Sequence, residues 1–299
     1  MCKVLVFSKN RPMQLHAYLQ SILHDNYIKY KDISVLYYND YPFNYDNVIN
    51  EFSEINWIKE YDFDYQLREW ILNCTDEFIM FGCDDVVFTH QFNVKYIEYI
   101  LRTYEDIFGF SLRLGTNIKG FPDDAIKEKK ICHWKWDNNK WDDFHYPWEL
   151  DCTVYRTSDV VDIISKYPDR FINPNYFEEF VALDWNYYIK RPELACYDSI
   201  SKAIVITINR VQDTHPNYYD DNCPSLEQLN ELYQNGHYMD IRKISKKEND
   251  VVHVGAEYLI MWSLYDGILR LSQMLSAHDQ YKNGIISQEE FVRRIDEKE

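Results

Sequence analysis

The feature that most constrains this chain is the stretch 77–88, which reads Glu-Phe-Ile-Met-Phe-Gly-Cys-Asp-Asp-Val-Val-Phe. Its apolar run, residues 78–82, is typical of a strand buried on both faces in a parallel sheet. Asp84 and Asp85 follow at the carboxyl end, the edge where open α/β sheets bind ligands. Two carboxylates there suit Mg²⁺ or Mn²⁺ carrying a diphosphate. The alternative is that both residues cap a helix beginning near Thr89.

Strand and helix patterns alternate before this stretch. Apolar runs at 3–7, 33–38 and 56–58 predict strands, and helix patterns begin at Pro12 and cover 64–73. The alternation predicts an α/β fold, with a mostly parallel sheet flanked by helices. The loops after the first two strands then lie at the same edge as the acidic pair. This convergence brings together Ser8, Asn10, Arg11, Asp40, Asp84 and Asp85, although each alone is also typical of a turn or cap.

Composition limits the partners of the chain. The 299 residues are 46% hydrophobic and carry a formal net charge of -17, which predicts a globular protein that does not bind nucleic acid. No apolar run reaches the length of a membrane span, and the start lacks a signal-peptide pattern. Seven cysteines without paired spacing predict reduced thiols and no zinc site. We therefore expect a cytoplasmic protein whose contact with a membrane, if any, is peripheral and comes through a molecule that it binds.

The chain also resembles a known family over its first 115 residues. It begins Lys-Val-Leu-Val-Phe-Ser-Lys-Asn-Arg-Pro at 3–12, has a helix ending Leu-Gln-Ser-Ile-Leu, an Asp after the second strand, and then the strand that enters Asp-Asp. This pattern resembles nucleotide-sugar glycosyltransferases of the GT-A fold, above all the large inverting family whose first loop contains Asn-Arg-Pro. The chain departs from the family's Asp-x-Asp signature at Cys83, which puts metal use in question.

The resemblance implies a reaction and a donor site. A sugar would pass from a nucleoside diphosphate, UDP in particular, to a hydroxyl of a glycan acceptor, with inversion. Asp85 would bind Mn²⁺ or Mg²⁺, and Asp84 would contact the ribose or a metal-bound water. Asp40 would recognise the uracil, and Arg68, on the helix before the acidic strand, would contact a phosphate or the ribose.

The later part of the chain would supply the base and a further metal ligand. In similar enzymes a carboxylate near the start of a helix accepts the acceptor's proton. The matching positions are Glu178 or Glu179, with Asp184 second, and the strand 150–156 would carry Asp151 toward the acceptor. His215 would complete the metal shell, with His253 as its rival. Lone residues of these types are more often solvated surface carboxylates or non-ligating histidines.

The domain prediction is a GT-A-like catalytic domain over 1–222 and a mainly helical region over 223–299. The Trp-rich insertion 116–148 is either a β-ribbon or lid beside the acceptor or a small aromatic core. A predicted helix over 255–277 either packs on the first domain or forms a homo-oligomer surface. Residues 279–290 approximate a calcium-binding EF-hand loop, but Tyr281 replaces an oxygen ligand, which favours a plain helix-turn-helix.

Two other functions compete with the glycosyltransferase hypothesis. A nucleotidyltransferase would need a Gly-rich loop after the first strand, and residues 8–12 contain no Gly. A catalytically inactive relative that still binds the nucleotide sugar is supported by Cys83 at the first signature position.

Overall fold

The computed structural model describes residues 2–24, 28–137, 139–211 and 223–263, together with residues 280, 282, 285–287 and 290. Its strands are β1 (Cys2–Lys9), β2 (Ile33–Tyr38), β3 (Asn56–Lys59), β4 (Phe78–Cys83), β5 (Val86–Phe88), β6 (Ile107–Ser111), β7 (Ile126–Glu128), β8 (Ile131–Lys135), β9 (Thr153–Arg156), β10 (Glu193–Tyr197), β11 (Ala203–Ile206), β12 (His237–Met239), β13 (His253–Val254) and β14 (Met261–Ser263). The α-helices are α1 (Pro12–Leu23), α2 (Asp46–Glu51), α3 (Phe63–Leu72), α4 (Val94–Thr103), α5 (Thr157–Ser165), α6 (Pro174–Leu183), α7 (Trp185–Tyr188), α8 (Leu226–Gln234) and α9 (Ile241–Ile244). Short 3₁₀ helices are η1 (Tyr30–Asp32), η2 (Asp143–His145) and η3 (Ala256–Tyr258).

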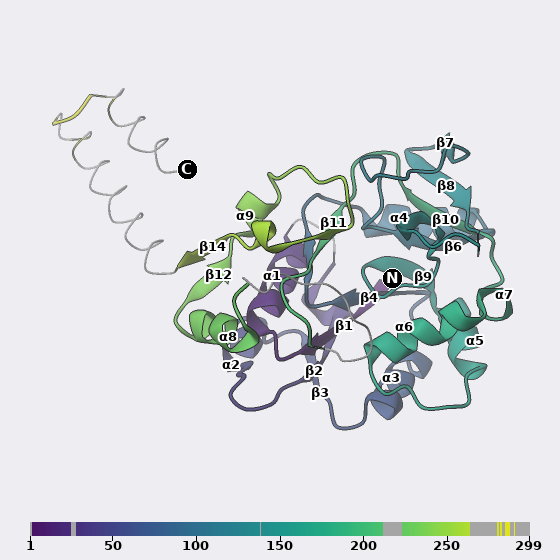
Figure 1. Cartoon of the computed structure of the whole chain (residues 1–299), viewed down its shortest axis with the longest axis horizontal. Helices are drawn as coiled ribbons and strands as arrows, with labels where there is room; N and C mark the ends of the chain where they lie inside the picture. The colour runs from purple at the N-terminus through teal and green to yellow at the C-terminus, as the bar shows by residue number, and fades with distance from the viewer. Residues whose placement is uncertain are drawn as a thin grey trace.

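A central sheet of nine strands has the order β3-β2-β1-β4-β9-β6-β10-β8-β7 (Figure 1). Strands β3, β2, β1 and β4 are parallel, and β9 and β8 run opposite to the other strands. Helices α3 and α5 contact each other, whereas α1 contacts α2, α8 and α9. The predicted fold class, an α/β GT-A-like fold with a mostly parallel sheet flanked by helices, is confirmed.

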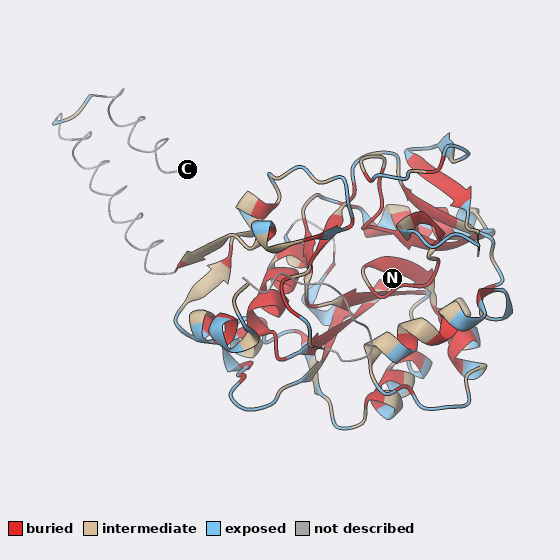
Figure 2. Ribbon diagram, viewed as in Figure 1, coloured by how far each residue is buried: buried red, intermediate tan, exposed pale blue. Residues whose placement is uncertain are grey.

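The strands at the centre of the sheet are apolar because both of their faces are covered. Every residue of Phe78 to Phe81 in β4 is fully buried, and Figure 2 shows the same burial across the neighbouring strands. Gly82 is required by close packing, since a Cβ there would lie 2.2 Å from the Tyr18 hydroxyl oxygen. The apolar run 78–82 therefore lies in the middle of the core.

The acidic pair lies at a change of sheet. Asp84 and Asp85 form the turn between β4 and β5, and β5 belongs to a second sheet of order β13-β11-β5. The next helix, α4, begins only at Val94 and is capped by Asn93, whose side chain accepts a hydrogen bond from the Tyr96 amide. The alternative prediction, that the pair caps a helix near Thr89, is wrong because a β-strand follows the pair.

The insertion 116–148 extends the central sheet. Its strands β7 and β8 form a hairpin, and β8 pairs antiparallel with β10. Trp134 packs edge-on against Phe144 at a centroid distance of 5.4 Å, so the segment holds a small aromatic core as well as a β-ribbon.

The described part after residue 222 contains both helices and strands. Helices α8 and α9 are joined there by a two-stranded sheet of β12 and β14, and β13 pairs with β11 of the preceding region. In the predicted helix 255–277, the described residues form η3 and β14 instead, and the rest lies outside the described residues. Half of the positions in 279–290 also lie outside the described residues. All seven cysteines are free thiols, as predicted, and within the described ranges no helix is long and apolar enough to cross a membrane.

Candidate active site

The carboxyl ends of β1, β2 and β4 meet at one edge of the sheet. The parallel registers pair Lys9 with Tyr38 and Phe7 with Cys83, so the loops that follow these strands are neighbours. The sequence-predicted residues Ser8, Asn10, Arg11, Asp40, Asp84 and Asp85 do lie together at this edge.

Asp84 is the buried centre of this group. Its Oδ1 accepts a hydrogen bond from Arg11 Nη1 at 3.0 Å, and its Oδ2 accepts from Ser8 Oγ at 2.8 Å and the Lys9 amide at 3.2 Å. Burial raises the pKa of Asp84 to about 6, against the lowering effect of Arg11. With three donors around it, Asp84 is ionised at neutral pH and holds the first loop against the acidic turn.

Arg11 bridges both acids and a distant segment. Its Nη1 also donates to Asp85 Oδ2 at 2.9 Å, while Nε donates to Asn209 Oδ1 at 3.0 Å and Nη2 to the Asn209 carbonyl. The guanidinium group is only 7% exposed. Arg11 therefore orients the acidic pair, and its donors are already engaged by protein groups.

Asp40 is oriented by Asn10, which lies in the loop after β1. Its Oδ2 accepts from Asn10 Nδ2 at 3.2 Å, and its amide donates to Asn10 Oδ1 at 2.9 Å. Asn10 has a φ of 57°, a left-handed conformation that Asn tolerates better than most residues. The Tyr38 hydroxyl donates to Asp40 Oδ1 at 2.9 Å. These bonds lower the pKa of Asp40, which keeps its carboxylate ionised at the edge of the site.

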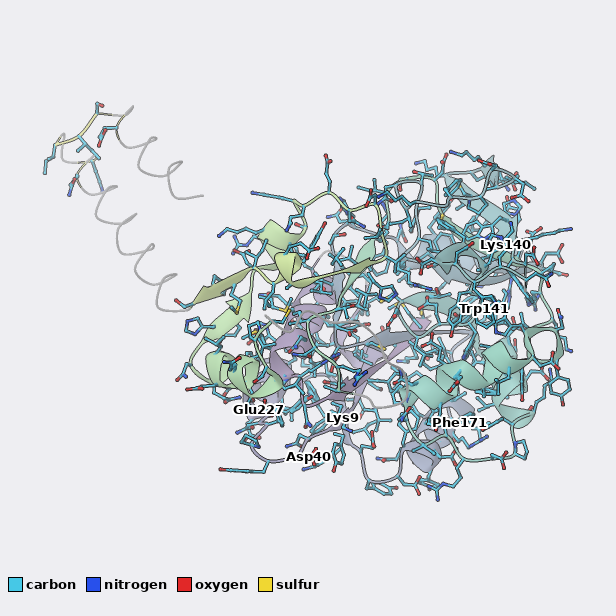
Figure 3. All side chains as sticks on the ribbon, in the orientation of Figure 1. Lys9, Asp40, Lys140, Trp141, Phe171 and Glu227 are labelled. Carbon is cyan, nitrogen blue, oxygen red and sulfur yellow. The ribbon has the colours of Figure 1, made fainter. Side chains whose placement is uncertain are left out.

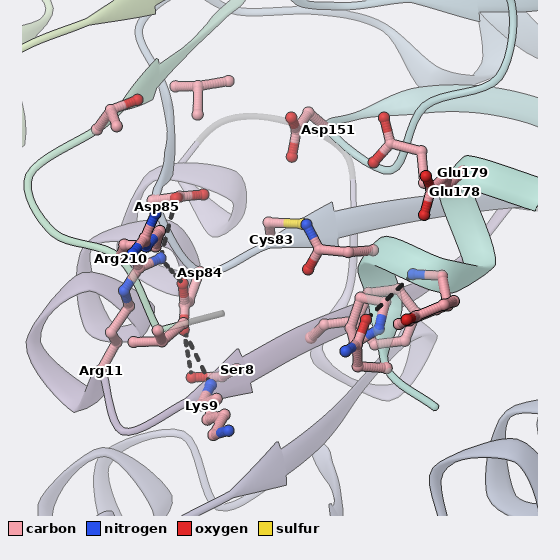
Figure 4. A pocket seen from close by; sticks show the side chains of 18 of the residues that line it. Ser8, Lys9, Arg11, Cys83, Asp84, Asp85, Asp151, Glu178, Glu179 and Arg210 are labelled. Atoms are coloured by element: carbon pink, nitrogen blue, oxygen red, sulfur yellow. Dashed lines mark hydrogen bonds and ion pairs between the residues drawn. The ribbon is translucent and has the colours of Figure 1, made fainter. Parts of the chain in front are cut away.

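A cavity of about 1200 Å³ opens over this edge. One side is lined by Ser8, Arg11, Asp40, Asp84 and Asp85, together with Lys9, Tyr38, Glu60 and Arg210. The other side is lined by the insertion and α6, including Asp143, Tyr146, Glu178 and Glu179. Figure 4 shows Asp84 and Arg11 on one side, Glu178 and Glu179 across the space on α6, and Asp151 and Cys83 between them. Most of the predicted donor residues and the candidate residues Asp151, Glu178 and Glu179 thus face one cavity.

The far side is an acidic cluster around one buried cation. Arg113 lies 3.0 Å from Asp143 Oδ1 and 3.6 Å from Glu149 Oε2. Glu149 also accepts a hydrogen bond from the Asp151 amide. Among the described atoms, Glu149 Oε1 is buried without a hydrogen-bond partner. Several carboxyl groups therefore share the charge of Arg113.

This crowding changes how the carboxyl groups titrate. Burial, with repulsion from Asp151 and Glu149, raises the pKa of Glu178 to about 8. Burial and the charge of Asp85 raise the pKa of Asp151 to about 6, and burial raises that of Glu149 to about 7. Groups with pKa values near neutrality are suited to proton transfer.

Arg68 and Asp184 lie away from the cavity, and Asn10 does not line it either but orients Asp40. Arg68 pairs with Asp64 at 2.9 Å and donates to the carbonyls of Ile164 and Tyr167, so it joins α3 to the segment after α5. Asp184 accepts a hydrogen bond from the Tyr187 amide at 3.1 Å and caps α7. Asp184 is thus held by a local partner and Arg68 by both local and distant partners, and neither side chain faces the cavity. His215 lies outside the described residues, whereas its rival His253 lines the cavity from β13.

Sequence reasoning missed Arg113, Glu149 and Tyr146. Arg113 stood at the end of an apolar strand pattern, and nothing local indicated that it would be buried. Glu149 and Tyr146 lie at or beside the end of the Trp-rich insertion, whose composition was the only available signal.

The metal prediction rests on Asp85. Within the part of the chain that the structure describes, no group of three or more His, Cys, Asp or Glu side chains could hold a metal ion. Mg²⁺, however, is often bound by one or two carboxylates together with substrate phosphates. Asp85 is partly exposed at the cavity, with Asp151 close enough for its pKa to respond to the Asp85 charge. These oxygen donors fit a metal that is completed by a substrate.

Comparisons with known proteins give one informative relative. No family model matches the chain. The chain is 30% identical over 304 residues to the bifunctional glycosyltransferase pgtA of Dictyostelium discoideum, across 86% of this chain but only 39% of that protein. The chain therefore corresponds to well under half of its relative.

Similar solved structures are more distant. They include S. aureus TarS 1–349 in complex with UDP-GlcNAc, with a TM-score of 0.45 and 12% identity over 73% of this chain and 62% of that one. Mannosyltransferase PcManGT from Pyrobaculum calidifontis, in complex with GDP-Man and Mn²⁺, has a TM-score of 0.31 and 8% identity over 55% of this chain and 52% of that one. These likenesses are too weak to carry an argument. The sequence relationship to pgtA alone confirms the predicted resemblance of this chain to the glycosyltransferases.

Proposed function

We propose that this protein transfers a sugar from a nucleoside diphosphate sugar, with UDP as the nucleotide, to a hydroxyl group of a glycan, with inversion at the sugar carbon. The observation that carries the proposal is the single cavity that has Asp84, Asp85 and Arg11 on one side and Asp151 and Glu178 on the other. Such a cavity separates a leaving-group site from a proton acceptor. The relationship to a glycosyltransferase supports the same reaction.

The donor side has groups for each part of a nucleoside diphosphate. Asp40, with its carboxylate held by Asn10 and Tyr38, is suited to accept a hydrogen bond from the N–H of a uracil. Tyr38 lies beside it and is 36% exposed, with Lys9 Nζ 5.6 Å from the centroid of its ring, so its exposed part could contact a base. Lys9 and Arg210 line the same side and supply positive charge near a diphosphate.

A divalent metal would be held by Asp85, with His253 or Asp151 as the second protein ligand from the cavity wall. Such an ion supplies Lewis-acid stabilisation of the departing diphosphate. Cys83 does not take the place of the missing first acid. Burial raises the pKa of its thiol, which stays neutral and lies 3.9 Å from the Leu150 carbonyl oxygen.

The acceptor's proton would go to Glu178. Its pKa of about 8 makes it a stronger base than an ordinary Glu, and it lies across the cavity from the donor groups. Asp151 lies between the two sides, where its charge would help to orient the acceptor hydroxyl. Attack from the side opposite the diphosphate inverts the sugar carbon.

Two alternatives remain less well supported. A nucleotidyltransferase would need backbone amides of a Gly-rich loop, and the first loop is instead closed by the Ser8, Asn10 and Arg11 side chains. An inactive nucleotide-sugar-binding relative is disfavoured by the raised pKa values on the acceptor side, which a pure binding site does not require.

The test combines binding with turnover. UDP-sugars should raise the melting temperature of the purified protein with Mn²⁺ or Mg²⁺ more than without it. One of them should be slowly hydrolysed in the absence of an acceptor. Asp85→Asn should lose at least about 10³-fold in turnover while remaining folded, because several kcal/mol of leaving-group stabilisation depend on it. Asp123→Asn, an exposed Asp outside the cavity, is the matched control.

The outcomes separate the hypotheses. Binding without hydrolysis or transfer would identify an inactive relative, and release of pyrophosphate from a nucleoside triphosphate would identify a nucleotidyltransferase. A fully active Asp85→Asn protein would exclude the proposed role of the acidic pair.

A further inference from the structure

The acceptor side of the cavity has an unusual rim of exposed apolar side chains. Trp141 is 73% exposed, Ile172 66%, Tyr176 39% and Leu183 79%, and all four line the cavity. Large apolar side chains are seldom left in water in a group unless they contact a ligand. We call these four residues the apolar rim.

The ring of Trp141 packs against a buried aromatic side chain of the protein. Its ring lies 5.4 Å from that of Trp185, which is almost completely buried and also contacts Trp136 and Tyr146. One part of the Trp141 indole is therefore fixed against protein, while most of it faces the solvent side of the cavity. Figure 3 shows Trp141 well apart from Lys9 and Asp40 of the donor side. This arrangement is a platform on which a ring can stack.

Helix α6 continues the rim. Phe177, Phe180 and Val181 pack into the core, and the cavity is lined by the residues of the other faces. Tyr176 and Leu183 lie seven residues apart on α6, a rise of about 10 Å along the helix axis. The rim is therefore longer than one sugar ring. The cavity volume of about 1200 Å³ also exceeds what a single small ligand occupies.

The charge around the rim excludes one class of acceptor. The carboxylates that line this side of the cavity are Asp142, Asp143, Asp151, Glu178 and Glu179. The only arginine or lysine from this side among the described lining residues is Arg113, which is 4% exposed and paired with Asp143 and Glu149. A phosphate, sulfate or carboxylate group on the acceptor would be repelled.

We propose that the acceptor is an uncharged glycan of at least two pyranose rings, with one ring stacked on Trp141 and the next extending along Tyr176 and Leu183. Sugar C–H groups carry partial positive charge and favour the negative face of an aromatic ring. The rim and the carboxylates together thus select an acceptor that is both neutral and extended. This inference rests on the proposed glycosyl transfer and names its second substrate.

The test measures transfer from the UDP-sugar that the protein hydrolyses. The acceptors are p-nitrophenyl glycosides of neutral monosaccharides (glucose, galactose, N-acetylglucosamine), the matching disaccharides (cellobiose, lactose, chitobiose), and 6-phosphate and uronic acid forms. The variants are Trp141→Ala and Leu183→Ala. Tyr61→Ala is the matched control, since Tyr61 is 75% exposed but lies outside the cavity.

We expect transfer to a neutral disaccharide with a KM about tenfold below that for its monosaccharide, and little or no transfer to charged forms. Trp141→Ala should raise the acceptor KM about tenfold for both, and Leu183→Ala only for the disaccharide. Donor hydrolysis and the donor KM should be unchanged in both variants, as in Tyr61→Ala.

Preference for a charged acceptor, failure of every neutral glycoside while the donor is still hydrolysed, or an unchanged acceptor KM in Trp141→Ala would each overturn this inference and leave the proposed function standing. Loss of donor binding and hydrolysis in the wild-type protein would instead overturn the proposed function.

Discussion

The two sides of the cavity handle buried negative charge in opposite ways. On the donor side, Asp84 accepts hydrogen bonds from Arg11, Ser8 and the Lys9 amide, so its charge is compensated by three donors. On the acceptor side, Glu149, Asp151 and Glu178 all depend on the charge of Arg113. The pKa of Asp84 rises only to about 6, whereas that of Glu178 rises to about 8.

The difference teaches that burial alone does not make a carboxylate a base. Both sides are buried, and the charges and donors around each carboxyl group also affect its pKa, which is about 6 for Asp84 and Asp151 and about 8 for Glu178. A fully compensated carboxylate fixes loops in place. An incompletely compensated one is ready to exchange a proton.

The largest expected effect is on Glu178. We expect Glu178→Gln to lower kcat by about 10²-fold to 10⁴-fold, because the amide cannot accept the proton of the acceptor. The donor affinity, measured by titration with the UDP-sugar, should stay the same. Glu179→Gln is the informative neighbour on the same helix. If the loss appears in Glu179→Gln and not in Glu178→Gln, the base is Glu179.

Removing Arg113 should destabilise the cluster of carboxyl groups on the acceptor side and leave the donor side unchanged. Arg113→Met would leave buried carboxylates uncompensated and lower the free energy of unfolding by about 3–5 kcal/mol at pH 8, measured by urea denaturation. The loss should shrink at pH 5, because carboxyl groups with raised pKa values are then protonated. Arg170→Met, at a 70% exposed site paired with Asp62, should cost less than about 1 kcal/mol. If Arg113→Met loses as much free energy of unfolding at pH 5 as at pH 8, Arg113 does not act by compensating these carboxylates.

The close packing of strand β4 against helix α1 can also be tested. Gly82→Ala would place a Cβ 2.2 Å from the hydroxyl oxygen of Tyr18, which is fully buried. We expect a loss of about 1–3 kcal/mol in the free energy of unfolding, since the ring has no open space to enter. Ser165→Ala, at an exposed position on α5, should stay within about 0.5 kcal/mol of the wild type. Equal stability of the two variants would mean that β4 and α1 can separate freely.

The last test is the dependence of the rate on pH. A base with a raised pKa is active only when ionised, so kcat/KM should rise about tenfold per pH unit up to about pH 8 and then level off. The Glu178→Gln variant should lose this rise. A rate that is already level at pH 6 would show that the base is a group with a lower pKa, such as Asp151.

The donor side was largely predictable from sequence and the acceptor side was not. Strand runs and turn residues are local signals, so the convergence of Ser8, Asn10, Asp40 and Asp84 followed from the alternation of strands and helices. The position of Arg68 away from the cavity could not be predicted, because helix position alone does not say which partners a long side chain finds, and Asp64 lies one turn away.

On the acceptor side the outcome depended on contacts between distant segments. Arg113 is buried beside Asp143 and Glu149, which both lie 30 or more positions later in the chain. Asp184 matched the pattern of a functional carboxylate but is a helix cap, a role that Asp performs equally well. Composition identified the aromatic insertion without indicating which Trp faces the cavity.

The contact between Arg11 and Asn209 also affects how the site is assembled. Arg11 is held by Asn209, 198 positions later, and the Asp85 carbonyl accepts a hydrogen bond from the Ile206 amide. During synthesis the first loop and the acidic turn emerge from the ribosome long before these partners exist. A nascent chain that stops short of residue 203 would already contain β1, β2 and β4, yet lack the restraint on Arg11. The site can therefore be completed only after the segment around residue 209 has been synthesised.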